Sequence, residues 1–140
     1  MTVKIVTDST SDLPREEAEA LGITVVPLNV HFGMEVFKEQ VDLSADEFYR
    51  RLVTEEELPK TSQPSIGDFI AAYERIGRDA DGIVSVHVSG RVSGTINSAR
   101  QAALQADVPC PIEVQDTLQA SMGIGMVAIE AATVAASGAD

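Results

Sequence analysis

Apolar residues fall into two kinds of segment that alternate along this chain. Short runs rich in β-branched residues predict strands, and they occupy residues 3–7, 23–32, 83–88 and 112–114. Between the runs, helical spacing of apolar residues or helix start signals predict helices from about residues 14, 44, 65, 94 and 118. Because strands alternate with helices, we expect an α/β fold with a mainly parallel sheet flanked by helices.

Single residues mark the limits of several predicted elements. Ser44 with Glu47 fits a capping box at the start of the second helix, and Ser65 marks the start of the third. Pro27 lies inside the run 23–32, which predicts an edge or irregular strand there. The helix starts are therefore better defined by the sequence than the limits of this strand.

The predicted last helix, from about residue 118 to 137, is apolar around its whole circumference and carries Glu130 as its only charge. A helix of this kind is buried on every side, so we expect a second domain, another subunit or a long apolar ligand to cover it. A membrane span is disfavoured because the segment is short, rich in alanine and charged at Glu130. Without a covering partner, we expect an exposed apolar patch formed by Met122, Ile124, Met126, Val127 and Ile129.

Composition limits the domain count and the class of partner. A chain of 140 residues fits one domain or one half of a two-lobed protein. Ten basic and 22 acidic residues give a formal charge of −12, which repels nucleic-acid phosphates and anionic lipids. We expect neither a nucleic-acid partner nor stable membrane association. One cysteine and an N-terminus without a charged leader or long apolar segment predict a cytoplasmic protein.

Three polar segments follow predicted strands or precede predicted helices: "TDSTSD" (7–12), "KTSQPS" (60–65) and "SGRVSGT" (89–95). In parallel α/β sheets, ligands bind beyond the carboxyl ends of the strands. Small residues expose backbone N–H groups and a helix N-terminus adds partial positive charge, so these segments suit an anion. The same residues are also common in turns and caps, and composition alone leaves both interpretations open.

Aspartates after strands raise the hypothesis of phosphoryl transfer. In that case Asp8 would attack phosphorus, or Asp8, Asp12 and Asp116 would hold a magnesium ion. Their spacing is poor for a metal site, and no glycine–lysine phosphate loop is present. We therefore expect no metal and no cofactor. A phosphotransferase or hydrolase that uses Asp8 or Asp116 on a small phosphorylated substrate is kept as the alternative function.

Nucleophilic catalysis finds little support in the sequence. "GRVSG" places its glycines at the wrong offsets for a nucleophile elbow. His31 and His87 each lie in a predicted strand, which favours a structural role, and Cys110 has no activating neighbour. We predict no catalytic residue. The remaining candidates are hydroxyls able to bind an anion: Thr61, Ser62, Ser65, Ser89, Ser93 and Thr95.

Four stretches in this order, "DSTSDLP", "KTSQPS", "SGRVSGTINSA" and "DTLQASMGIGMVAIEAA", resemble the DegV family of bacterial fatty-acid-binding proteins. The resemblance covers essentially the whole chain. It implies that residues 1–140 form a DegV-like N-terminal α/β domain, that the last helix begins the inter-lobe region, and that a C-terminal lobe is absent. It also implies a non-enzymatic lipid-binding carrier that presents a long-chain fatty acid to the ATP-binding subunit of a fatty acid kinase, which phosphorylates the carboxylate.

The resemblance also implies the site residues. Thr61 and Ser93 match hydroxyls that bind the fatty-acid carboxylate, and Ser62, Gly94 and Thr95 match the surrounding loop. We expect the hydroxyls of Thr61 and Ser93 to converge near the N-terminus of the helix that begins at about Gly94. Where the family commonly has a serine, this chain has Gly90, so a supporting hydroxyl is expected to be missing. The family's C-terminal lobe supplies an arginine and a histidine near the carboxylate, and that lobe or a second subunit would cover the last helix.

Overall fold

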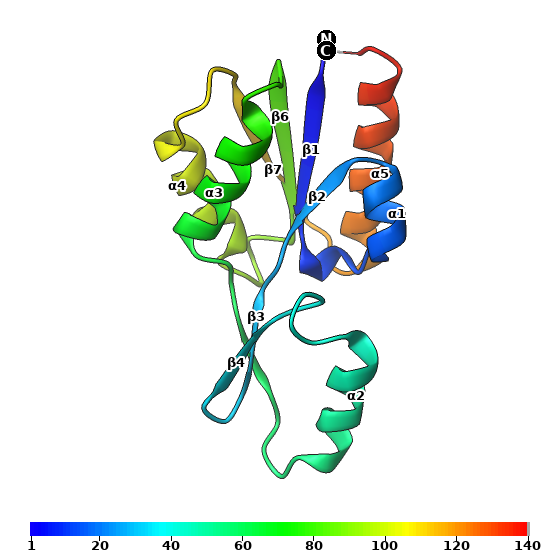
Figure 1. Cartoon of the computed structure of the whole chain (residues 1–140), viewed down its shortest axis with the longest axis vertical. Coiled ribbons are helices and arrows are strands. Elements are labelled where there is room, and N and C mark those ends of the chain that lie inside the picture. The colour runs from blue at the N-terminus through cyan, green and yellow to red at the C-terminus, as the bar shows by residue number, and fades with distance from the viewer. Residues whose placement is uncertain (140) are drawn as a thin grey trace.

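A four-stranded parallel sheet forms the centre of the computed structural model, which describes residues 1–139 (Figure 1). The strand order is β2-β1-β6-β7, and every neighbouring pair is parallel. The prediction of an α/β fold with a mainly parallel sheet is confirmed. The strands coincide with β-branched runs of the sequence: β1 (Val3–Asp8), β2 (Ile23–Val26), β6 (Gly82–His87) and β7 (Ile112–Asp116).

Helices cover both faces of this sheet (Figure 1). α1 (Arg15–Ala20) and α5 (Met122–Ala136) lie on one face, and α3 (Ile66–Gly77) and α4 (Thr95–Gln105) lie on the other. Ile5 of β1 belongs to the core beneath α1 and α5, whereas its neighbour Val6 packs in the core with α3 and α4. The central strand is thus apolar on both faces, as expected for a strand of a covered parallel sheet.

A second, smaller unit lies beyond the carboxyl ends of β1 and β2 (Figure 1). Its antiparallel sheet has the order β4-β3-β5, and α2 (Ala45–Thr54) packs beside it. The guanidinium of Arg51 lies over the rings of Phe32 and Phe37, with its carbon 4.4 and 5.1 Å from the ring centres. The three strands are β3 (Asn29–Phe32), β4 (Glu35–Lys38) and β5 (Lys60–Ser62).

The small sheet corrects two predictions. The run 23–32 is two strands in different sheets, because the chain leaves β2 at Pro27 and Leu28 before β3 begins. The segment 60–65 is a loop only from Gln63 onward, since its first half forms β5 by pairing with β3. Both β4 and β5 went unpredicted because they are short and mostly exposed, so they lack a recognisable apolar pattern.

Side-chain caps fix the start of α3 fully and the start of α2 in part. Ser65 accepts a hydrogen bond from the N–H of Asp68, whose carboxylate accepts one from the N–H of Ser65. At α2, Ser44 accepts from the N–H of Glu47 at 3.2 Å, but the Glu47 carboxylate pairs with Arg50 instead of returning to Ser44. The capping box predicted for α2 is therefore only half formed.

The last helix begins at Met122 and not near Leu118. The preceding segment turns sharply, with positive φ angles of 55° at Leu118 and 53° at Ser121. Only one side of α5 faces the sheet, and that side includes Ile124. Ile124 is fully buried and Ile129 half-buried, so the prediction that both belong to an exposed patch is wrong. The exposed apolar residues of α5 are Met122, Met126, Val127 and Val134.

Among residues 1–139, no helix is long and apolar enough to cross a lipid bilayer. This finding includes α5, whose 15 residues fall short of the length that a membrane span requires.

Candidate functional site

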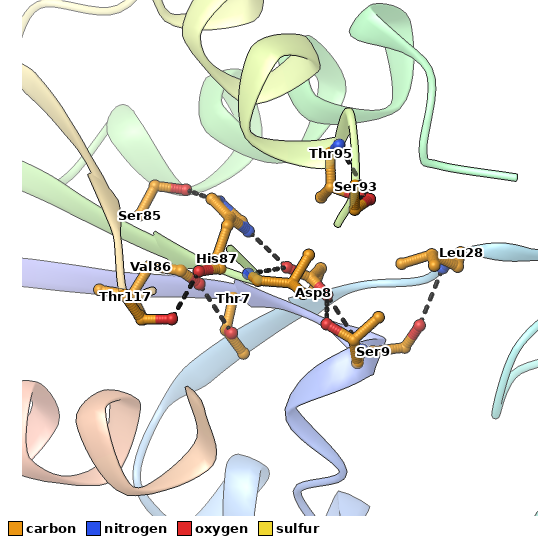
Figure 2. Close-up of polar contacts among 12 residues, drawn as sticks. Thr7, Asp8, Ser9, Leu28, Ser85, Val86, His87, Ser93, Thr95 and Thr117 are labelled. Atoms are coloured by element: carbon orange, nitrogen blue, oxygen red, sulfur yellow. Dashed lines mark hydrogen bonds and ion pairs between the residues drawn. The ribbon is translucent and has the colours of Figure 1, made fainter. Parts of the chain in front are cut away.

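Polar side chains gather where β1, β6 and β7 end (Figure 2). Asp8, His87 and Asp116 are the last residues of these three strands, and His87 is paired in register with Asp116. Parallel strands bring their carboxyl ends to one edge of a sheet, so residues far apart in sequence meet there. This edge also faces the small sheet and the start of α4.

A hydrogen-bonded chain of four buried side chains runs from this edge along the face of the sheet that α3 covers. His87 Nδ1 lies 2.7 Å from Asp8 Oδ2, and His87 Nε2 lies 2.6 Å from Ser85 Oγ (Figure 2). Ser85 Oγ in turn lies 2.8 Å from the hydroxyl of Tyr73 on α3. All four side chains are inaccessible to solvent.

One arrangement of protons satisfies this whole chain. The Tyr73 hydroxyl donates to Ser85, Ser85 donates to His87 Nε2, and His87 Nδ1–H donates to the ionised carboxylate of Asp8. Burial raises the pKa of Asp8, but the interactions with His87 and the two hydrogen bonds from Thr10 outweigh it, so the pKa lies below its usual value. Burial raises the pKa of Tyr73 to about 12, which keeps the phenol protonated.

The order Asp8, His87, Ser85 is that of a hydrolytic triad, yet the geometry supports a structural role. Ser85 is inaccessible, and its oxygen is already held between His87 and Tyr73, so no substrate carbonyl can reach it. The prediction of a hydrogen-bonded strand histidine is confirmed for His87. His31 is likewise bonded within the small sheet, to Ser62 at 2.9 Å.

Asp8 also shapes the loop after β1. Its Oδ1 accepts hydrogen bonds from the N–H and the hydroxyl of Thr10, which caps the 3-10 helix η1 (Ser9–Ser11). Ser9 donates to Glu39 at 2.5 Å and accepts from the N–H of Leu28 at 2.9 Å (Figure 2). These bonds tie the end of β1 to the linker between the two sheets.

The aspartates considered for phosphoryl transfer are either buried or already hydrogen-bonded within the fold. Asp8 is fully buried, and Asp116 accepts from the N–H groups of Gly90 at 3.0 Å and Leu118 at 2.9 Å. These two backbone bonds lower the pKa of Asp116. Asp12 accepts from the hydroxyl of Ser121 at 2.6 Å. Within the part of the chain that the structure describes, no three or more His, Cys, Asp or Glu side chains are grouped to hold a metal ion.

Stability should depend on pH through Asp8. The pKa of Asp8 is lower in the folded chain than in the unfolded chain, where it is about 3.9. The ionised carboxylate therefore contributes its full stabilisation at a pH well above this unfolded value. This stabilisation is lost as the pH falls from about 3.9 toward the pKa of the folded state. We expect Asp8→Asn to be less stable than the natural chain at pH 7, with a gap that narrows below about pH 4. Urea denaturation of both proteins between pH 3 and pH 7 measures this gap. A gap that is constant or widens on acidification would contradict the ionised Asp8.

Two of the predicted hydroxyls of "SGRVSGT", those of Ser93 and Thr95, lie at the start of α4 (Figure 2), whereas Ser89 accepts from the N–H of Arg91 in the loop before it. Ser93 Oγ lies 2.8 Å from the hydroxyl of Thr95 and accepts a hydrogen bond from the N–H of Thr95 at 3.2 Å. Ser93 is half-buried and Thr95 is buried. Gly94 occupies the N-cap position of α4 and offers no side chain, so the positive end of this helix lacks the usual cap.

Two of the hydroxyls of "KTSQPS", those of Thr61 and Ser62, lie on β5, and Ser65 caps α3. Thr61 is exposed and pairs with Val30 of β3. Ser62 also is exposed, and besides its contact with His31 it accepts from Nδ2 of Asn29 at 3.4 Å. The convergence of Thr61 and Ser93 on one anion stays a prediction, although the structure brings their two segments together through Gln63.

The contact through Gln63 joins the loop after β5 to the first turn of α4. A Cβ atom added to Gly94 would lie 2.4 Å from Gln63 Oε1, so the amide occupies the space that a side chain at this position would take. The amide also donates to Ser98 Oγ at 3.4 Å. The predicted site segments 60–65 and 89–95 are therefore neighbours in space.

Comparison with known proteins identifies the family of this fold. A family model described as "Uncharacterised protein, DegV family" matches residues 2–140. The chain belongs to the DegV family. A DegV domain-containing protein of Staphylococcus aureus is 44% identical over 121 residues, which make up 86% of this chain and 42% of that relative.

Solved structures agree with the DegV assignment. A DegV family protein from Thermus thermophilus, described as fatty acid binding, matches with a TM-score of 0.90 at 36% identity, over 100% of this chain and 49% of that one. A stearic acid-binding protein from Eubacterium ventriosum matches with a TM-score of 0.89 at 30% identity, again over 100% of this chain and 49% of that one. The DegV chain described here thus spans about half the length of the relatives that it matches.

Gly90, where the family resemblance leads us to expect a serine, lies close to Asp116 and Ile96. A Cβ atom on Gly90 would lie 3.0 Å from Oδ2 of Asp116 and 3.1 Å from Cγ2 of Ile96. The N–H of Gly90 donates to that same carboxylate oxygen. A side chain at position 90 would therefore crowd Asp116 and Ile96.

Two features of this DegV site were missed from the sequence. Ser85 and His87 are two residues apart on a strand, so they share a face, and this alternation was a usable signal. Their partner Asp8 is 79 residues away from His87, and no local pattern links the two. Gln63 lies within "KTSQPS", but no local pattern indicates its contact with Gly94, which only the fold creates.

Proposed function

We propose that this DegV-family chain binds a long-chain fatty acid whose carboxylate is held by Thr61 and Ser93, with Ser62, Gly94 and Thr95 forming the surrounding loop. The observation that carries the proposal is the pair of hydroxyls, Ser93 and Thr95, at an N-terminus of α4 that has no side-chain cap, beside the segment bearing Thr61. A helix N-terminus with nearby hydroxyl donors is a favourable place for an anion. Fatty acid binding by the structurally matching proteins supports this ligand class.

Head group and tail contribute differently to binding. Each charge-assisted hydrogen bond to the carboxylate is worth about 1.5–3 kcal/mol. A tail of about 15 methylenes gains roughly 12 kcal/mol on leaving water, before the costs of ordering. The tail therefore supplies most of the affinity, and the hydroxyls fix the orientation of the carboxylate.

The exposed apolar face of α5 suits an arrangement in which a further lobe or subunit covers it. Met126 is 61% exposed and Met122 38%, which leaves apolar surface without a partner in this chain. We place residues 1–140 as the N-terminal lobe of a two-lobed protein, in which a C-terminal lobe or a second subunit covers this face and encloses the acyl tail. The match to about half of each relative supports this placement.

In this role the protein is a carrier in the cytoplasm and not itself an enzyme. It presents the bound carboxylate to the ATP-binding subunit of a separate fatty acid kinase, which performs the phosphorylation. Asp8 is buried, and Asp116 accepts hydrogen bonds from two backbone N–H groups. Both observations disfavour the alternative of phosphotransferase or hydrolase chemistry in this chain.

Solvent extraction of the purified full-length protein, followed by mass spectrometry, tests the proposed function. We expect a long-chain fatty acid at close to one molecule per protein. The matched assay measures metal-dependent phosphate release from small phosphorylated compounds. An extract without fatty acid, or substantial phosphate release, would overturn the carrier function in favour of the alternative.

Surface charge predicts how the carrier behaves toward membranes. The net charge of −12 should keep the protein off anionic lipid surfaces, so transfer of a fatty acid requires a protein partner or transient insertion of the tail. In a sedimentation assay with phosphatidylglycerol vesicles, we expect the protein to remain in the supernatant. Tight binding that weakens with added salt is the contrary result.

A further inference from the structure

We infer that Gln63 is a positioning residue of the proposed head-group site, because its amide holds the strand bearing Thr61 against the start of the helix that follows Ser93. The inference rests on the proposed function and adds to it a residue that need not touch the ligand. It concerns the relative placement of the two hydroxyls and not their chemistry.

The amide of Gln63 is packed on the first turn of α4. A Cβ atom on Gly94 would lie 2.4 Å from its Oε1, 2.8 Å from its Nε2 and 2.9 Å from its Cδ, so the whole amide group faces this glycine. Nε2 also donates to Ser98, four residues along and on the same side of the helix. Any side chain at position 94 would force this amide to move.

The backbone around Gln63 is held by the small sheet on the opposite side. Asn29 Nδ2 lies 3.4 Å from both the carbonyl oxygen of Gln63 and the hydroxyl of Ser62. Pro64, directly after it, is fully buried. Asn29 thus ties the backbone at Ser62 and Gln63 to the small sheet, while the Gln63 side chain makes a hydrogen bond from this segment to α4.

No second hydrogen bond between residues 60–65 and α4 occurs in the described range 1–139. Without the amide, Thr61 would keep its pairing with Val30 but lose its fixed distance from Ser93. Two donors orient one carboxylate only if both are held within about 0.5 Å of the productive geometry. Loss of Gln63 should therefore weaken binding of the head group selectively.

The test compares two ligands that differ only in the head group. Stearic acid and 1-octadecanol are titrated into the full-length protein as the natural chain, Gln63→Ala and Gln101→Ala. Gln101 is an exposed glutamine on α4 that serves as the matched control. Unlike Gln63, it makes no hydrogen bond between α4 and residues 60–65 in the described range. We expect Gln63→Ala to raise the Kd for stearic acid about tenfold and to change that for octadecanol less than twofold. Gln101→Ala should match the natural chain for both ligands.

Gly94→Ala provides a second, independent variant. Its methyl group displaces the same amide while leaving Gln63 in place, so it should give the same selective loss. Because both changes remove one contact, the double variant should bind stearic acid no more weakly than either single one. Thermal denaturation shows that each variant is folded at the assay temperature, and Gly94→Ala decides the matter should Gln63→Ala unfold.

Two results would overturn the inference, and they are distinguishable from failure of the proposed function. Unchanged stearic acid binding in Gln63→Ala, or an equal loss for acid and alcohol, would show that Gln63 does not position the head-group site. A natural chain that binds neither ligand would instead overturn the fatty acid function itself, and with it the role of Gln63.

Discussion

Replacement of Asp8 by alanine should destabilise the protein by about 3–5 kcal/mol, the largest effect that we expect from a single substitution. The buried carboxylate accepts hydrogen bonds from His87 Nδ1 and from the N–H and hydroxyl of Thr10. Alanine leaves the buried His87 donor and the half-buried Thr10 donors without an acceptor, and a buried donor of this kind costs about 1–3 kcal/mol. Urea denaturation at pH 7 measures the change in unfolding free energy.

Asp79→Ala is the matched control, because Asp79 is an exposed aspartate outside this network. It should change stability by less than about 0.5 kcal/mol. His87→Ala should also be costly, and the double variant Asp8→Ala/His87→Ala less so than the sum, because the two residues share one contact. Equal stability of Asp8→Ala and Asp79→Ala would show that the buried chain contributes nothing to the fold.

Ser93→Ala and Thr61→Ala should each weaken carboxylate binding by about 1–3 kcal/mol, which is roughly 5- to 150-fold in Kd, because a partly desolvated carboxylate loses a hydrogen-bond donor. Their effect on folding should be smaller. Ser93 accepts a hydrogen bond from the N–H of Thr95 in the loop before α4, and loss of a local hydrogen bond of this kind costs about 1 kcal/mol. Titration of stearic acid into each full-length variant, alongside thermal denaturation, measures both effects.

Octadecanol again separates the head group from the tail. Its binding should be almost unaffected by either substitution, since the apolar tail contacts are unchanged. If the hydroxyls of Ser93 and Thr61 serve only as ordinary turn and cap groups, the substitutions would lower stability and leave stearic acid binding unchanged. That reverse order would contradict the proposed anion site.

The elements that the sequence predicts well are those with local signals. The start signal at Ser65 and the apolar spacing after it place the beginning of α3 within one residue. The β-branched runs that become β1 and β6 are buried on both faces and contain few polar residues. Local chemistry determines such elements, so their position does not depend on distant contacts.

The elements that the sequence missed depend on distant contacts. β5 forms because the segment 60–62 pairs with β3, about 30 residues earlier, and its own residues are all exposed. The start of α5 is delayed by positive φ angles at Leu118 and Ser121, which these residue types rarely adopt. Composition showed α5 to be apolar but gave no means of telling that Ile124 faces the core while Met126 faces outward.

For the candidate site, the sequence indicated the segments 60–65 and 89–95 and left their geometry undetermined. Ser93 and Thr95 were expected at a helix start and lie there. The bridge from Gln63 to Gly94 crosses between two units of the fold, so no pattern within either segment reveals it. Family resemblance named Thr61 and Ser93, whereas the structure adds the contact that places their segments side by side.

The most direct test of the head-group site is a crystal structure of the full-length protein with stearic acid bound. We predict that the carboxylate lies at the N-terminus of α4, with its oxygens within about 3.2 Å of the hydroxyls of both Thr61 and Ser93. A carboxylate bound elsewhere, or hydroxyls of Thr61 and Ser93 too far apart to reach one anion, would contradict the shared site.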